Sequence, residues 1–253
     1  MKKRVITISA IVAGIIILGL FFLWVLLPRI MIYKIVKDFF PSIDKNVEYF
    51  TDFSVSSAEE VVTVDNGFVS VSIPKRFKYN EDKAEIIQSY GDADSKESFF
   101  FQSSHDSSEL NLLDPEKLKD IEGVPKNFDL QEIAEGFESL GNGLPDSAYN
   151  TYKCTLLVSK DDYSFWNLKN GVCYAIAAVY KATAISSYDD VYLYERGDIR
   201  GIIYATHNHR ENGMEWVVFK VYRADDLNTV HTIQVTVKDI NEAYAIINSA
   251  EFI

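Results

Sequence analysis

Cysteine and histidine are scarce in this 253-residue chain, which contains 2 and 4 of them. Two cysteines cannot build a disulfide scaffold or a four-thiolate zinc site. Glycine (12) and proline (6) are also few, which excludes collagen-like and low-complexity chains. Lys and Arg number 25 against 37 Asp and Glu, so we expect no nucleic-acid partner, because that affinity comes largely from basic side chains at phosphates.

Apolar side chains, by contrast, are plentiful. Hydrophobic residues make up 47% of the chain and aromatic residues 13%, with 15 Tyr and 16 Phe. A chain of this length can bury a substantial core as one large domain or two small ones. The sequence therefore predicts a folded acidic protein.

The first residues form a long uncharged run. Val5–Leu27 contains 23 residues without a charge, of which 19 are hydrophobic. As a helix it would be about 34 Å long, enough to cross a hydrocarbon core of about 30 Å. Residues 2–4 are all basic, whereas Arg29, Lys34 and Lys37 are more widely spaced after the run. This bias predicts a cytoplasmic N-terminus and an extracytoplasmic C-terminal part.

The alternative is a cleaved secretory signal, which needs small residues at its cleavage site. Residues 21–41 contain no Ala, Ser or Gly, so we favour an uncleaved anchor. The expected organisation is a tail (1–4), a transmembrane anchor (5–27), a juxtamembrane stalk (28–59) and an extracytoplasmic domain (60–253). The stalk helix is expected to end at Pro41. Residues 51–253 hold 18 basic and 34 acidic side chains, so this part should stand away from an anionic bilayer.

Alternating apolar residues predict the strands. Val61–Ile73 consists of two alternating runs around Asp65-Asn66-Gly67, which is a strong hairpin signal. Shorter apolar runs predict strands at 84–89 and 98–103. Four further runs are joined by short connections, which predicts an antiparallel meander of strands at 191–194, 199–206, 214–222 and 229–237.

Capping residues and apolar periodicity predict the helices. Asp114, Asp129 and Asp239 each precede a helical pattern. Residues 146–158 fit a helix, and part of that segment fits a strand; capping chemistry at 145–147 favours the helix. A longer helix is expected from Asp161 to Ile185. Together these elements predict an α+β fold in which helices cover an antiparallel sheet.

Two segments resemble the ends of PsbP-like domains. Asn66-Gly-Phe-Val-Ser-Val-Ser-Ile-Pro-Lys-Arg-Phe77 looks like their opening hairpin, and Ala245-Ile-Ile-Asn-Ser-Ala-Glu-Phe252 is similar to their last helix and apolar tail. The resemblance would frame residues 60–253 and implies an α/β/α sandwich. It also implies a binding or assembly subunit without a shared catalytic set. The anchor and the extra central helices depart from that family.

The strongest candidate for a metal site is the cluster His207, His209 and Glu211. Alternate histidines at a strand end point the same way, and with a carboxylate they could hold zinc and activate a water molecule. Asn212-Gly213 follows directly, which is typical of a hairpin tip where polar residues occur without any metal. We favour the hairpin tip and expect no resident metal or cofactor.

Other polar patterns are weaker. Asp92 and Asp94 alternate as in calcium loops, but Glu97 and Ser103 occupy the positions that need Gly and Glu. Residues 103–108 combine hydroxyl, imidazole and carboxylate groups, and we expect a surface loop rather than a catalytic triad.

The cysteines and the aromatic residues leave two questions open. Cys154 and Cys173 could form a disulfide outside the cell, or remain two buried thiols, which we favour slightly. Trp166, Trp216 and the tyrosines of the predicted strands could line a ligand groove, although most should be core. The tyrosines to examine are Tyr192, Tyr194, Tyr204 and Tyr222.

These observations predict a membrane-anchored, extracytoplasmic, non-catalytic binding or accessory domain with an envelope protein as a possible partner. Two alternatives remain: a metal-dependent hydrolase using His207, His209 and Glu211, and a subunit of a membrane complex held by its anchor.

Overall fold

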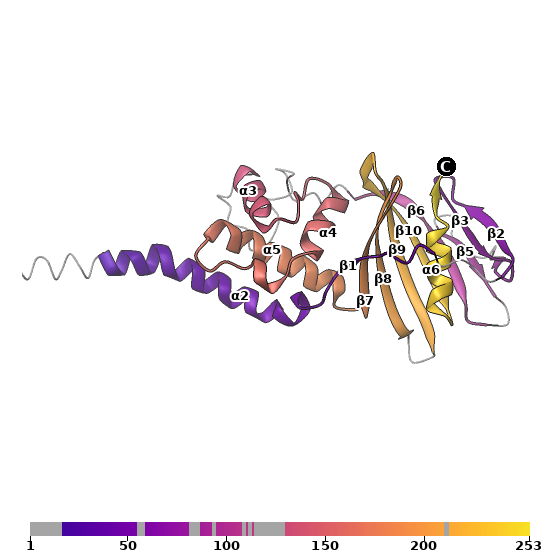
Figure 1. Cartoon of the computed structure of the whole chain (residues 1–253), viewed down its shortest axis with the longest axis horizontal. Helices are drawn as coiled ribbons and strands as arrows, with labels where there is room; N and C mark the ends of the chain where they lie inside the picture. The colour runs from indigo at the N-terminus through magenta and orange to yellow at the C-terminus, as the bar shows by residue number, and fades with distance from the viewer. Residues whose placement is uncertain are drawn as a thin grey trace, which may run out of the picture.

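The computed structural model describes residues 17–253 except 55–58, 81–86, 93–94, 108–109, 111–112, 114–129 and 210–212. It is a mixed α+β fold extended along one direction (Figure 1). An N-terminal apolar helix leads into a group of helices, a large sheet follows, and a small sheet with the last helix lies on the far side.

The large sheet has eight strands in the order β1-β7-β8-β9-β10-β6-β5-β4. Its strands are β1 (Glu48–Tyr49), β4 (Lys78–Tyr79), β5 (Ile87–Gly91), β6 (Ser98–Asp106), β7 (Asp190–Arg196), β8 (Ile199–His209), β9 (Met214–Arg223) and β10 (Asp226–Val237). The β7–β10 pairs are all antiparallel, which confirms the predicted meander. The short strand β1 adds a parallel pair at the β7 edge, and it was not predicted.

The small sheet confirms the predicted hairpin. It joins β2 (Val61–Asp65) and β3 (Val69–Pro74) with β11 (Glu251–Phe252). Gly67 has a φ of 85°, and the Asn66 side chain accepts hydrogen bonds from the N–H groups of Phe68 and Val69. The two segments that carry the PsbP-like resemblance are therefore neighbours, because β11 pairs with β3.

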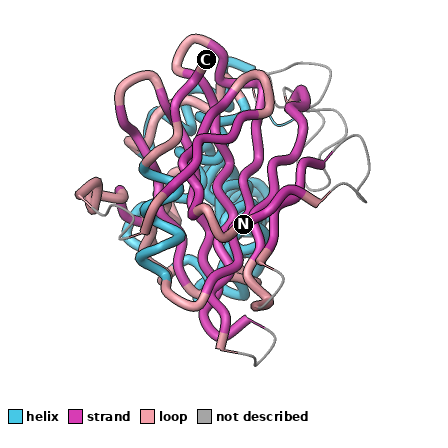
Figure 2. The backbone as a smooth tube through the Cα atoms, turned by 90° about the vertical axis from the view of Figure 1, so that its right-hand side faces the viewer, coloured by secondary structure: helices cyan, strands magenta, loops and turns pink. Residues whose placement is uncertain are grey.

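One face of the large sheet packs against this small sheet and helix α6 (Ile240–Asn248), with Asp239 as the predicted cap. When the molecule is viewed from that side, the strands lie in front of the helices that pack on the opposite face (Figure 2). The buried residues between the layers are β-branched or aromatic for the most part, for example Ile73, Phe99, Phe219 and Val235. We call the two sheets and α6 the sheet half.

The other face carries the helical lobe, which we define as α2 (Leu27–Ile43), α3 (Leu130–Leu140), α4 (Ala148–Leu156) and α5 (Leu168–Ile185). Residues of α4 and the end of α5 pack on the sheet, whereas α2, α3 and α5 mainly pack on one another. The expectation that helices cover the sheet is therefore only partly met, because the lobe has a core of its own.

The structure refines the predicted helices. The segment 146–158 contains α4, capped by the Ser147 side chain, as predicted. The helix expected from Asp161 begins instead at Leu168, because Asn167 caps it by accepting the N–H of Asn170. Residues Lys160–Asp162 form a single 3-10 turn. The expected helix start at Asp114 and the Asp129 cap lie outside the described residues.

The N-terminal helix is long and apolar enough to span a membrane over Ile17–Pro41. It includes a wider π-helical turn at Phe22–Leu26 and continues into α2 without a break. The prediction that the helix ends at Pro41 was wrong. Pro41 lies inside the last turn of α2, which continues to Ile43. The last turn is held by packing, since Ile43 is 2% exposed.

The expected stalk at 28–59 is therefore wrong as a separate segment. Val36 is fully buried in the core of the helical lobe, and Phe50 is buried in the core of the sheet half. Ile32, Phe39, Phe40 and Ile43 of the same helix also lie in or against the core of the helical lobe. The packed core of the protein therefore already includes residues of α2, the helix that directly follows the apolar run.

Candidate ligand-binding cleft

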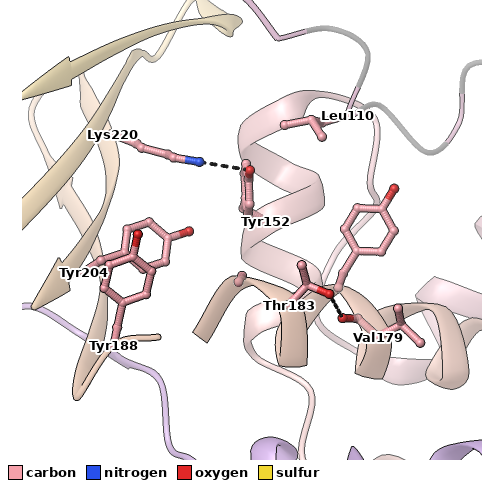
Figure 3. Close-up of a pocket in the computed structure, with 9 residues that line it drawn as sticks. Leu110, Tyr152, Val179, Thr183, Tyr188, Tyr204 and Lys220 are labelled. Atoms are coloured by element: carbon pink, nitrogen blue, oxygen red, sulfur yellow. Dashed lines mark hydrogen bonds between the residues drawn. The ribbon is translucent and has the colours of Figure 1, made fainter. Parts of the chain in front are cut away.

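A cleft of about 410 Å³ opens between the helical lobe and the large sheet. Four tyrosines surround it: Tyr152 on α4, Tyr180 on α5, Tyr188 in the turn after α5 and Tyr204 on β8. Lys220 on β9 supplies the one cationic side chain among its lining residues. Figure 3 shows Lys220 reaching from the sheet toward Tyr152, with Tyr188 and Tyr204 close together below it.

Strand alternation explains how the sheet presents these groups. Tyr204 pairs with Val218, and Ile202 pairs with Lys220, so all four side chains lie on the face toward the helical lobe. Trp216 lies on the same face and stacks on Tyr188, with ring centroids 5.8 Å apart. Tyr188 in turn contacts Tyr204 at 4.6 Å between centroids. The result is a continuous aromatic wall along one side of the cleft.

Lys220 is placed against this aromatic wall rather than against a carboxylate. Its ammonium donates a hydrogen bond of 3.0 Å to the Tyr152 hydroxyl. It also lies 4.6 Å from the centre of the Tyr152 ring and 5.7 Å from that of Tyr204, which are cation–π distances. Among the described residues, no carboxylate forms an ion pair with it. An ammonium has three donors, so two remain for another acceptor.

Burial keeps three tyrosine hydroxyls of the cleft, those of Tyr180, Tyr188 and Tyr204, protonated at neutral pH, because it raises their pKa values. Burial raises the pKa of Tyr180 and of Tyr188, and the neighbouring Tyr152 adds to both effects. Tyr204 is 2% exposed, and its burial raises its pKa well above the usual value. Neutral phenols can donate hydrogen bonds, so the cleft offers donors and apolar ring faces, with a single positive charge.

The predicted aromatic residues divide between the cleft and the core. Tyr204 lines the cleft, and Trp216 lies next to the cleft, stacked on its lining residue Tyr188. Tyr194 and Tyr222 are fully buried, and Tyr192 is partly buried against α6. Trp166 is 68% exposed and lies elsewhere.

The sequence analysis missed Tyr152, Tyr180, Tyr188 and Lys220. A signal for Lys220 exists, because it interrupts an otherwise apolar alternating face of Trp216, Val218 and Tyr222. The helical tyrosines carry no comparable signal, since their common position depends on tertiary packing.

The His207 cluster has a different environment from the one predicted. His207 Nδ1 lies 2.5 Å from Glu215 Oε2, and Nε2 lies 2.8 Å from Asp190 Oδ2, so both ring nitrogens face carboxylates. Asn208 has a φ of 49° and the strand register shifts there, which interrupts the alternation assumed for His207 and His209. Glu211 lies outside the described residues. Within the described residues, no group of three or more His, Cys, Asp or Glu could hold a metal ion.

The cysteines are two free buried thiols in the helical lobe. Cys173 Sγ lies 3.6 Å from the carbonyl oxygen of Ile133, and Cys154 Sγ lies 3.4 Å from that of Thr151. Burial raises the pKa of each thiol to about 12. The bridge considered between them is absent from this structure.

The structure also bears on the two weaker polar patterns, residues 103–108 and the loop of Asp92 and Asp94. Residues 103–106 belong to strand β6 and not to the expected surface loop, with His105 paired to Val230 in the ladder. In the suggested calcium loop, Asp94 lies outside the described residues, while Glu97 is 7% exposed and ion-paired with Arg76 at 3.3 Å. Glu97 thus serves a structural ion pair.

Two other hollows are less suited to a ligand. One of about 550 Å³ is lined mainly by the turn after α3 and by α4, and its lysine, Lys153, is already paired with Glu195 at 2.7 Å. Another, of about 290 Å³, lies beside β11 around His231 and Arg223. In the comparisons with known proteins, no family model and no curated protein matches this chain.

Proposed function

We propose that this chain is a membrane-anchored, extracytoplasmic, non-catalytic binding domain, and that its ligand is an apolar molecule or side chain carrying one anionic group. The ligand occupies the tyrosine-lined cleft between the helical lobe and the large sheet. The observation that carries the proposal is Lys220, a cation among aromatic rings without a carboxylate partner among the described residues.

The chemistry of the cleft favours this ligand class over a neutral one. A neutral apolar ligand would gain from the ring faces, but it would leave two ammonium donors of Lys220 without a protein acceptor. A carboxylate or a similar anion would satisfy them and form a charge-assisted hydrogen bond. A cationic ligand would face repulsion from Lys220. The combination of aromatic wall and single ammonium therefore selects for an anion with an apolar body.

The anchoring part of the proposal is supported by the apolar N-terminal helix. The basic residues at 2–4 favour a cytoplasmic N-terminus, and with that orientation the cleft would lie outside the cytoplasm. The PsbP-like resemblance is consistent with a binding role, and we keep it as part of the proposal. In that family the role is one of accessory binding rather than catalysis.

The test uses a matched acid and amide, 4-phenylbutyrate and 4-phenylbutyramide, which have nearly the same shape but differ in charge. The full chain carrying Trp24→Phe and Trp166→Phe is placed in lipid nanodiscs, so that Trp216, which stacks on the cleft residue Tyr188, reports binding by its emission. We expect the acid to bind at least 10-fold more tightly than the amide, as a charged hydrogen bond of roughly 1.5–3 kcal/mol would give.

Two variants decide the origin of this preference. Lys220→Met should bring the acid to the affinity of the amide, whereas Lys153→Met, in the neighbouring polar hollow, should leave the preference unchanged. Equal affinity of the two probes for the unaltered cleft, or a preference that survives Lys220→Met, would refute the proposed ligand class. So would the absence of binding by both probes.

A further inference from the structure

The helical lobe contacts the N-terminal helix close to the end of its apolar run. Arg29, the first charge after Val5–Leu27, donates one hydrogen bond of 2.5 Å to the carbonyl oxygen of Val25. It donates a second, of 3.2 Å, to the carbonyl oxygen of Trp166. Trp166 lies in the loop before α5. The guanidinium therefore fixes this loop at the height where the helix acquires its first charge.

The surface around Arg29 is apolar and exposed. Trp166 is 68% exposed, and its ring contacts Phe165 edge-on at 5.2 Å. On α2, Tyr33 is 43% exposed. Tyr33 also contacts Tyr163 of the same loop, with ring centroids 6.1 Å apart. We call Tyr33, Phe165 and Trp166 the basal patch.

The heights along the helix match the interfacial region of a bilayer. Arg29, whose guanidinium holds the Trp166 loop, follows Leu27 by two residues, which is about 3 Å along a helix. The polar region on each side of the hydrocarbon core is roughly 5–8 Å thick. Trp and Tyr are enriched at this depth because a ring with one polar group suits it. Lys34 and Lys37 follow on α2, where their ammonium groups can reach lipid phosphates.

We infer that the basal patch is a lipid-docking surface: the helical lobe rests on the membrane, with Trp166 at the level of the headgroups. Continuity with the apolar helix favours lipid as the occupant, since Arg29 joins the patch directly to that helix. A second copy of the chain is the competing occupant. This inference rests on the anchor of the proposed function, and it replaces the expectation of a domain held away from the bilayer.

The three tryptophans supply a depth test in one molecule. Trp24 lies in the apolar helix, Trp166 in the basal patch and Trp216 in the large sheet. Three full-length variants each keep one Trp and carry Phe at the other two positions. Each is reconstituted in phosphatidylcholine vesicles that contain lipids brominated at acyl carbons 6,7 or 11,12. Quenching of Trp emission by bromine then measures the depth of each ring.

We expect Trp24 emission to fall at least two-fold, and Trp166 to be quenched more strongly by the shallow bromines than by the deep ones. Trp216 should be quenched no more than a water-soluble control. Quenching of Trp24 with none at Trp166 would overturn the docking surface while leaving the anchor intact. No quenching at Trp24 would overturn the anchor itself. Shielding of Trp166 from both bromolipid and aqueous acrylamide would indicate a second copy instead.

Discussion

The helical lobe and the sheet half are built on different principles. The sheet half is held by long antiparallel ladders around a core of β-branched and aromatic side chains. The helical lobe lacks such ladders, and its core includes two thiols and lies next to a buried lysine, Lys181. It also depends on α2, which continues the apolar helix. The comparison indicates that the helical lobe is the less self-sufficient half.

Removing α2 should produce the largest effect and should separate the two halves. A chain of residues 46–253 loses the burial of Val36, Phe39, Phe40 and Ile43 in the core of the helical lobe. At roughly 1.5–3 kcal/mol for each fully buried side chain, the loss is on the order of 5 kcal/mol, comparable to the stability of a small domain. We expect the lobe to unfold and Cys154 and Cys173 to react rapidly with a thiol reagent.

The matched control is a chain of residues 27–253, which keeps α2 and should keep both thiols protected. Hydrogen exchange in β8–β10 should remain slow in both chains, because the ladders of the sheet half stay intact. Equal thiol protection in the two chains would contradict the dependence of the lobe on α2.

Glycine-to-alanine changes compare the packing of the two halves. At Gly201 in β8, an added Cβ would lie 2.4 Å from Phe219 Cε2 and 2.8 Å from the carbonyl oxygen of Lys220. At Gly136 in α3, it would lie 2.3 Å from Cys173 Sγ and 3.3 Å from the carbonyl oxygen of Lys169. Backbone cannot move aside easily, so Gly201→Ala should cost about 3 kcal/mol of unfolding free energy. Gly136→Ala should cost about 1 kcal/mol, since helix propensity offsets part of the clash.

A second substitution in each variant tests which neighbouring atom causes the loss of stability. Cys173→Ala should restore stability in the Gly136→Ala background, because the sulfur is the close neighbour there. Phe219→Leu should not restore it in the Gly201→Ala background, because the Lys220 carbonyl remains. Chemical denaturation of the four variants measures this, and equal rescue at both sites would argue against the distinction.

The same contrast explains what could be predicted from the sequence. Strand alternation and the Asn66-Gly67 turn predicted the hairpin and the meander, because these patterns are local. The sequence could not show that Val36 and Ile43 pack against protein, because the same apolar spacing also suits a helix that lies in the lipid interface. Tyr204 of the cleft, and Trp216 beside it, lie on strands that the alternating pattern predicted. Tyr152, Tyr180 and Tyr188 meet them only through the docking of α4 and α5 on the sheet.

Lys181 offers a pH test of the helical lobe. Its ammonium is 2% exposed and donates to the carbonyl oxygens of Ile43 at 3.1 Å and Val158 at 2.7 Å. Burial lowers the pKa of Lys181 to about 8 from 10.5. Between these values the unfolded chain binds more protons than the folded one, so stability should rise with pH. We expect Lys181 itself to contribute a gain of about 2 kcal/mol between about pH 7 and pH 9.5. This gain is the difference between the unaltered chain and Lys181→Met, because the raised pKa values of Cys154 and Cys173 make stability fall over the upper part of the same range.

Denaturation of the full chain in detergent at several pH values measures this slope. Lys181→Met should remove the rise, although the protein is less stable at every pH because two carbonyl groups lose their donor. Lys220→Met, in the cleft, should keep the rise. A slope that is unchanged in Lys181→Met would show that another group causes it.

His207 in the sheet half should respond to pH in the opposite direction and by the smallest amount. Hydrogen bonds to Asp190 and Glu215 raise the pKa of His207 above 6.5. Its contribution to stability is therefore complete below about pH 6.5 and is lost as the pH rises through the folded-state pKa. The side chain is 44% exposed, so solvent screening keeps the effect below about 1 kcal/mol. Proton NMR titration of the imidazole should show a raised pKa that falls in Asp190→Asn, and His207→Ala should flatten this part of the stability profile. A normal imidazole pKa in the unaltered chain would mean that the carboxylates do not hold the ring, and the two halves would then no longer differ in the sign of their pH response.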